Sequence, residues 1–287
     1  MVNTPTIRLN MPETAYHSHP ALSSTGARRI LDSPARFDYW QRHPQPGKQS
    51  FDVGTAVHTK VLGIGAGTIA YPDEHVTASG AVSTKAATVA WAEEQRALGL
   101  TPVAPAQAAR IDGMAEAVLK HETAGPLFER GGNSEASVFS TDEDTGVDMR
   151  ARFDYLSLTG LPVAVDLKTT AKTASVDGFT RTVADYGYDV QQAHYLRTLR
   201  NRSIPFYFVV VEAEAPHLVG VHTLDIEWAR MGEARVQRAL ELYATCTASG
   251  IWPGYPTEPQ LISPPNWLVY QHEDEYGPVE TTTVRYL

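Results

Sequence analysis

Two residues near the middle of the chain place an acid and a base at a spacing that suits catalysis. Asp166 and Lys168 belong to the apolar, β-branched segment 163–168, which predicts a strand. Side chains two positions apart on a strand point to the same face. The carboxylate and the ammonium should therefore project side by side, with Val165 and Leu167 buried behind them.

A second acid belongs to the segment just upstream. Residues 149–156, which include Asp154, alternate charged and apolar side chains, and this alternation predicts another strand. A turn with glycine and proline at 159–162 predicts a hairpin. If the two strands pair antiparallel, Asp154, Asp166 and Lys168 can meet at one end of the sheet. Two carboxylates there suit a divalent metal, with the lysine close to the attacked group.

Two segments upstream of these strands, a helix and a further strand, offer additional metal ligands. The segment 53–62 has helical spacing; in it, Gly54 lets another backbone come close and His58 lies one turn further on. A strand is expected over 134–139, and its Glu135 could bind a second metal directly or through water.

A helix is also expected around 183–200. Its Gln191 and Tyr195 lie one turn apart and share a face, so they could hydrogen-bond a DNA strand or the lysine. For phosphate binding we expect Arg28, near a helix start, and Arg150 and Arg152. The last two alternate with Asp154 on one strand face.

Composition limits the class of protein. The chain has 287 residues, 43% of them apolar, and a net charge of −9. It has a single cysteine, Cys246, which excludes a disulfide framework and a cysteine-ligated zinc or iron–sulfur site. No signal peptide or membrane-spanning run is evident. The acidic balance argues against a general nucleic-acid coat but allows a local basic groove.

The order of the expected elements predicts an α/β fold with a mixed sheet flanked by helices. We expect one domain over 1–287, with a mainly helical part at 1–130 and the sheet and its helices at 131–250. A Pro- and aromatic-rich extension should follow at 251–287 and pack on the body. Residues 1–20 should form an extended arm.

Taken together, these motifs resemble the PD-(D/E)XK nuclease superfamily, most closely its RecE-type (exonuclease VIII-like) phage and prophage branch, which is related to the RecB nuclease domain. The residues that carry the resemblance are Gly54 and His58 of a G-x-x-x-H helix, the acid Asp154, Asp166 and Lys168 of the D-x-K element, and Gln191 and Tyr195 of a Q-x-x-x-Y helix. Phe153 stands where the literal "PD" would have proline, and Asp166 stands where lambda-type enzymes have glutamate.

The resemblance implies a restriction-endonuclease-like core and a Mg²⁺-dependent exonuclease, with Mn²⁺ possible. Its catalytic residues would be Asp154, Asp166, Lys168, Gln191 and Tyr195. Its metal ligands would be His58, Asp154, Asp166, the carbonyl of Leu167 and, less directly, Glu135. The substrate would be linear double-stranded DNA, resected 5′ to 3′ in the cytoplasm of a bacterial host. The partners would be a RecT-like annealing protein and further copies of the chain in a ring.

Other interpretations stay open at this point. The enzyme could be a structure-specific or Cas4-like nuclease, although one cysteine cannot supply the Cas4 cluster, or the chain could be a catalytically silent DNA-end-binding subunit. Asp166 and Lys168 could form a surface ion pair worth ~0–1 kcal/mol. The other candidates also have structural interpretations. His58 could be a core histidine, Asp154 a turn residue at a strand end, and Glu135 an ordinary exposed charge on a strand. Gln191 and Tyr195 could pack the helix on the sheet, and Arg28 could lie on a solvated helix face.

Overall fold

A computed structural model describes residues 4–43, 53–65 and 67–278 of the chain. The chain divides into two compact units, Met1–Pro253 and Gly254–Leu287, and each is described by itself. The end of the expected C-terminal extension, 279–287, lies outside the described residues. The expected single domain over 1–287 stays a prediction.

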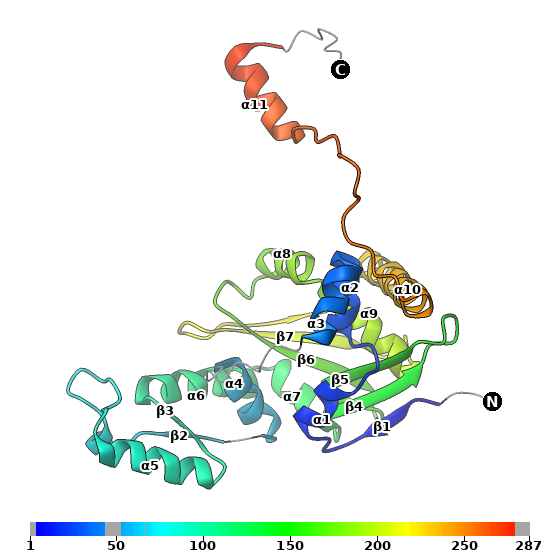
Figure 1. The fold of residues 1–287 in the computed structure, drawn as a ribbon. Coiled ribbons are helices and arrows are strands. Elements are labelled where there is room, and N and C mark those ends of the chain that lie inside the picture. Colours follow the sequence, from blue (N-terminus) through cyan, green and yellow to red (C-terminus); the bar gives the residue numbers. More distant parts are fainter. Residues whose placement is uncertain (1–3, 44–52, 66, 279–287) are drawn as a thin grey trace. The chain divides into compact units, whose positions relative to one another are not determined.

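The first unit contains a six-stranded sheet in the order β1-β4-β5-β6-β7-β8 (Figure 1). Only β6 and β7 run parallel; the other neighbours pair antiparallel. The strands are β1 (Thr6–Arg8), β4 (Asn133–Thr141), β5 (Asp148–Ser157), β6 (Val163–Thr170), β7 (Phe206–Glu212) and β8 (Val219–His222). The predicted mixed sheet and the predicted 159–162 hairpin are confirmed.

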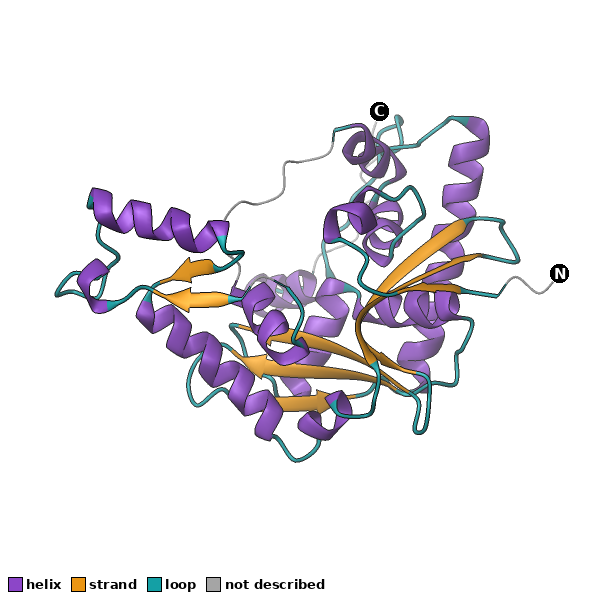
Figure 2. Ribbon diagram, turned by 90° about the horizontal axis from the view of Figure 1, so that it is seen from below, coloured by secondary structure: helices purple, strands orange, loops and turns teal. Residues whose placement is uncertain are grey.

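Helices cover both faces of this sheet (Figure 2). On one face, α4 (Val53–Leu62), α6 (Pro105–Lys120) and α7 (Ala124–Phe128) pack on a core that includes Val165 and Leu167, both fully buried as predicted. On the other face, α8 (Val176–Tyr186) and α9 (Tyr188–Leu199) pack on Phe153 and Phe208. Outside α9 lie α2 (Ser24–Asp32), α3 (Pro34–Arg42) and α10 (Ile226–Ser249).

A small substructure follows α4. Two short parallel strands, β2 (Thr68–Ala70) and β3 (Thr101–Val103), pair with each other. A 3₁₀ turn at Asp73–His75 and α5 (Ala86–Ala97) lie between them. Figures 1 and 2 show this substructure at one edge of the first unit, away from β4 and β5.

Two expectations about local structure are wrong. The helix expected around 183–200 is two helices, because Gly187 adopts a left-handed backbone (φ 65°) between α8 and α9. The N-terminal arm is not simply extended, since α1 (Glu13–Ser18) lies within it. Its strand β1 pairs with β4 through Ile7 and Val138.

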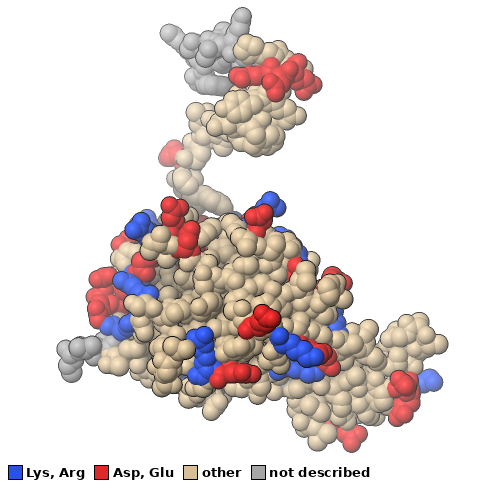
Figure 3. Space-filling model, turned by 180° about the vertical axis from the view of Figure 1, so that it is seen from behind, with Lys and Arg blue, Asp and Glu red and all other residues tan. Residues whose placement is uncertain are grey.

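The second unit contains α11 (Asn266–Tyr276), on which Trp267, Tyr270 and Tyr276 are exposed. None of the helices in the described part of the chain has the length and apolar character needed to span a membrane. On the face of the protein in Figure 3, acidic and basic side chains are interspersed.

Candidate active site

The site forms where β5 and β6 separate. The two strands pair only from Tyr155 opposite Val165 to Ser157 opposite Val163. Asp154 and Asp166 are the next residues in this register, so the two carboxylates lie at the fork. Like charges opposite each other on neighbouring strands are destabilising, so this arrangement needs cations to hold it.

Asp154 is held by a helix and by the neighbouring strand. The backbone N–H of Leu167 donates to Asp154 Oδ2 at 2.7 Å. His58 Nε2 lies 3.1 Å from the same oxygen, while its Nδ1 donates to the carbonyl of Gly54 at 2.8 Å. The Gly54 and His58 pair on α4 thus aims an imidazole at this acid.

Asp166 is almost fully buried, with 2% of its surface exposed. Lys168 Nζ lies 2.5 Å from its Oδ2, and the side-chain amide of Gln191 on α9 donates to its Oδ1. The same ammonium lies 4.7 Å from the centroid of the Tyr188 ring, a distance typical of a cation–π contact.

The charges of this site shift one another's pKa values. Burial alone would lower the pKa of His58, but the charge and hydrogen bond of Asp154 raise it to about 9. Burial opposes ionisation of Asp154, yet His58, Lys168 and the Leu167 N–H hold its pKa below the usual value. The pKa of Asp166 is raised by burial and by Asp154, against the pull of Lys168. Burial would lower the pKa of Lys168, but the two carboxylates raise it.

Glu135 lies beside this cluster on β4. The register pairs Ser134 with Tyr155 and Ala136 with Phe153, which sets Glu135 opposite Asp154. Its backbone is left-handed (φ 53°). Burial and the charge of Asp154 raise the pKa of Glu135, and the register places this third carboxylate opposite Asp154.

Tyr195 and Arg28 lie on the same side of the sheet but make structural contacts. The Tyr195 ring packs against Phe153, with 4.9 Å between centroids. Arg28 Nη1 donates to the carbonyl of Tyr186 at 2.5 Å, so it caps the end of α8. A role for Tyr195 or Arg28 toward DNA stays a prediction.

Arg150 and Arg152 bind the N-terminal segment. The Arg150 guanidinium donates to the carbonyls of Tyr16, His17 and His19. Arg152 donates to the carbonyl of Met11 at 2.6 Å and to the Ser137 hydroxyl at 3.0 Å; its Nη1 lies 3.6 Å from Glu135. These contacts give both side chains a structural task, and phosphate binding by them stays a prediction.

The donor set fits a divalent metal in kind. Two carboxylates, a backbone carbonyl and an imidazole match the preferences of Mg²⁺ and Mn²⁺. Across residues 4–43, 53–65 and 67–278, no three His, Cys, Asp or Glu side chains already stand together as a metal site. Lys168 and His58 occupy carboxylate oxygens instead, so binding of an ion would exchange these partners for the metal.

Sequence reasoning missed Tyr188, whose ring lies under the Lys168 ammonium. It also missed that Gln191 contacts Asp166 rather than the lysine. Tyr188 directly follows Gly187, and a glycine with a left-handed backbone interrupts a helix. This glycine was therefore the signal in the sequence that a new helix begins at Tyr188.

The comparisons with known proteins agree with this geometry. Residues 35–263 match the family described as a PDDEXK-like domain of unknown function, DUF3799. No curated protein matches the sequence. A solved structure of a protein from Eubacterium rectale, provisionally described as an exonuclease, is similar with a TM-score of 0.54 at 11% identity; the match covers 90% of this chain and 96% of that one. This likeness shows a shared fold.

A solved structure of the protein SSO0001 matches over 78% of this chain and 81% of its own, at 13% identity and a TM-score of 0.34, too low to support an argument. The family match spans most of the chain, and the fold and the D-x-K element agree with it. The chain therefore belongs to the PDDEXK-like domain family, and the resemblance to the PD-(D/E)XK superfamily is confirmed.

Proposed function

We propose that this protein is a metal-dependent exodeoxyribonuclease that hydrolyses linear double-stranded DNA. The observation that carries the proposal is the fork of β5 and β6, where the buried Asp166 pairs with the ammonium of Lys168 and the partly buried Asp154 lies close enough to raise the pKa of that lysine. The family match and the fold shared with the Eubacterium rectale protein support it.

Each side chain of the site has a task in this proposal. Asp154, Asp166, the Leu167 carbonyl and His58 would hold Mg²⁺, with Mn²⁺ as an alternative. When bound, such an ion polarises a phosphate and lowers the pKa of water. The two carboxylates raise the pKa of Lys168, which favours its ammonium form; in that form it would orient water or offset phosphate charge.

Two residues position these groups. Gln191 donates to Asp166 Oδ1, which leaves Oδ2 for Lys168 or a metal. The Gly54 carbonyl fixes the His58 ring so that Nε2 faces Asp154. Groups that orient ligands in this way commonly contribute 10- to 100-fold to metal affinity or activity.

The direction of resection and the partners are the finer part of the proposal. We expect degradation 5′ to 3′, which leaves a 3′ single strand for a RecT-like annealing protein. A homo-oligomeric ring in the bacterial cytoplasm would keep an acidic chain on its DNA, since its net charge of −9 repels a polyanion.

One observation favours a second candidate, a catalytically silent DNA-end-binding subunit. Both central carboxylates already have cationic partners within the chain, Asp154 with His58 and Asp166 with Lys168. If these ion pairs do not open, the site cannot take up a metal and would serve only to stabilise the fork.

A cleavage assay decides between the two. Linear duplex labelled at either the 5′ or the 3′ end is incubated with protein and Mg²⁺, beside a closed circular duplex. We expect mononucleotides from the 5′ end of the linear form only, and their loss in Asp166→Asn. Asp144→Asn is the matched control, because Asp144 is exposed and belongs to a different ion cluster. Binding without cleavage by the unmodified protein would overturn the exonuclease assignment.

A further inference from the structure

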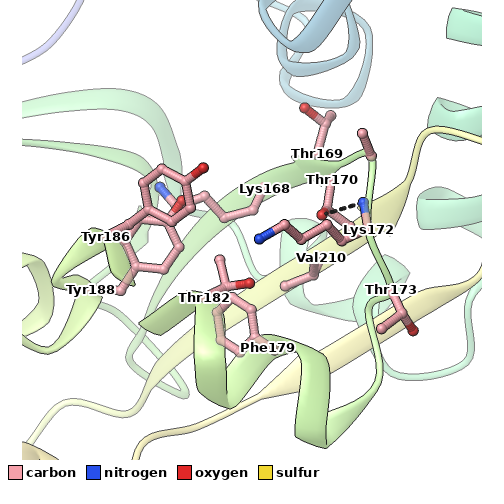
Figure 4. Close-up of a pocket in the computed structure, with 11 residues that line it drawn as sticks. Lys168, Thr169, Thr170, Lys172, Thr173, Phe179, Thr182, Tyr186, Tyr188 and Val210 are labelled. Atoms are coloured by element: carbon pink, nitrogen blue, oxygen red, sulfur yellow. Dashed lines mark hydrogen bonds between the residues drawn. The ribbon is translucent and has the colours of Figure 1, made fainter. Parts of the chain in front are cut away.

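A pocket of about 330 Å³ opens directly beside the catalytic lysine. It lies between the end of β6, the start of α9 and the inner face of α8 (Figure 4). Its lining residues are Lys168, Thr169, Thr170, Ala171, Lys172, Thr173, Phe179, Thr182, Tyr186, Tyr188 and Val210. A pocket of this volume is at the lower end of the range for small-molecule sites, about the size that one nucleotide needs.

The charges of the lining favour an anion. Two ammonium groups and four threonine hydroxyls line the pocket, and no carboxylate does, although acids outnumber bases in the chain. Figure 4 shows the Lys172 side chain extending across the pocket, between Lys168 and Thr182. Within the described part of the chain, no carboxylate forms an ion pair with Lys172. Its charge is therefore available to a phosphate.

The pocket also presents an aromatic surface. Tyr186 is 56% exposed, and its ring stacks on Tyr188 with centroids 5.9 Å apart and planes inclined by 20°. Tyr188 in turn is in contact with the Lys168 ammonium. Stacking on an exposed ring of this kind is the usual way in which proteins hold unpaired bases without reading their sequence.

The backbone holds these groups in place before any ligand binds. Arg28 Nη1 donates to the carbonyl of Tyr186, at the left-handed Gly187 that turns the chain from α8 to α9. The hydroxyl of Thr170 accepts a hydrogen bond of 3.0 Å from the backbone N–H of Lys172. A preorganised pocket loses less entropy when it binds its ligand.

We infer that this pocket binds one unpaired nucleotide next to the scissile phosphate, with its base stacked on Tyr186 and a phosphate at Lys172. The nucleotide is unpaired because the faces of a base inside a duplex are covered by its neighbours, and a pocket of this size does not hold a base pair. The inference rests on the proposed function and adds to it that the protein frays the DNA end before it cuts.

The test measures binding in EDTA, so that cleavage does not enter. The two labelled probes are a blunt duplex and the same duplex with four unpaired nucleotides at one end, which we call the open end. Binding of each probe is measured by fluorescence anisotropy. The unmodified protein should bind the open end more tightly. Tyr186→Ala should lose roughly tenfold in affinity for the open end and little for the blunt duplex. Tyr186→Phe should restore binding, because it keeps the ring.

Two exposed residues elsewhere provide matched controls. Tyr39→Ala removes a tyrosine that is 55% exposed on α3, and Lys85→Gln removes an exposed lysine before α5. Neither should change the preference for the open end, whereas Lys172→Gln should weaken binding several-fold and lower its dependence on salt.

The outcome separates this inference from the exonuclease proposal. If Tyr186→Ala binds the open end as tightly as the unmodified protein, or if the unmodified protein shows no preference for it, the inference is overturned, whatever the cleavage assay gives. If the preference depends on Tyr186 in a protein that cleaves nothing, the nucleotide subsite stands and the nuclease assignment fails.

Discussion

Two ion clusters of this molecule are built from the same kinds of charge and differ in how the charges are shared. In the active-site cluster, two acids, Asp154 and Asp166, are each contacted by single donors from several elements. In the second, which we name the Arg197 cluster, one guanidinium on α9 is surrounded by three acids. Its members are Arg197, Asp142, Asp144 and Glu233.

The Arg197 cluster is held together by one guanidinium. Arg197 has three nitrogens 2.6 to 3.0 Å from three carboxylates, and its side chain is 7% exposed. Arginine stays charged throughout the useful pH range, and its planar fork fixes the geometry of the acids around it. Such a cluster ties the β4–β5 turn to α9 and α10.

The active-site cluster, by contrast, contains cations whose ion pairs with the carboxylates can be broken. Lys168 contacts Asp166 with a single ammonium, its side chain is 22% exposed, and it borders the pocket of Figure 4. His58 can lose its proton, which arginine cannot. We conclude that the cation type, more than the number of charges, separates the exchangeable cluster from the structural one.

Replacing the cation of the active-site cluster should have the largest effect. We expect Lys168→Met to lower the rate of duplex degradation by about 10²- to 10³-fold, because the ammonium near the attacked phosphate is lost. The fold should tolerate the change, since Asp166, whose pKa is raised, can become a neutral acid that still accepts from Gln191. Nucleotide release is measured alongside urea unfolding.

Replacing the cation of the Arg197 cluster should lower the stability of the fold and leave the activity unchanged, the reverse of the effect expected for Lys168→Met. Arg197→Met leaves Asp142 buried without its main partner, which typically costs about 3–5 kcal/mol of unfolding free energy. Activity per folded molecule should not change, since none of the four members of the cluster belongs to the active-site cluster. Urea unfolding and the cleavage assay together check this. A rate loss larger than the unfolded fraction explains would contradict the contrast between the clusters.

The histidine makes the active-site cluster depend on pH. The pKa of His58 rises from its ordinary 6.5 to about 9 in the folded protein. The stability from its pairing with Asp154 is therefore fully present below pH 6.5 and is lost as pH rises through 9, an effect of up to about 3 kcal/mol. The difference in unfolding free energy between the unmodified protein and His58→Gln should be large at pH 6 and small at pH 10. A difference that grows with pH would mean that His58 is neutral in the fold.

The parts of the fold that could be predicted follow local patterns. The strand around Asp154 alternates at period two, and the apolar strand around Asp166 is buried on both faces, with Val165 and Leu167 fully buried as predicted. The hairpin between them spans few residues, so its register follows from the turn. The separate register of β4 with β5 places Glu135 opposite Asp154, although the sequence could not show the left-handed backbone of Glu135.

The parts that could not be predicted depend on contacts distant in sequence. Arg150 and Arg152 look like phosphate-binding residues on a strand, yet their guanidiniums bind carbonyls more than 130 residues away. Nothing in the strand itself reveals that the N-terminal segment crosses it. The Arg197 cluster likewise joins acids 36 to 55 residues from the arginine, and a lone arginine in a helical pattern predicts only a solvated face.

The smallest expected effect tests whether burial or charge count decides the strength of the Arg197 cluster. Asp142 and Asp144 both pair with Arg197, but their side chains are 4% and 68% exposed. Asp144→Asn should change the unfolding free energy by only ~0–1 kcal/mol, because water and salt screen an exposed pair. Asp142→Asn should cost several times more, since it removes the one buried carboxylate among the three partners of the Arg197 guanidinium, and this acid is the chief cause that raises the pKa of Arg197 against burial. Equal effects in urea unfolding would show that the arginine redistributes its bonds freely, and the cluster would then be less rigid than its geometry indicates.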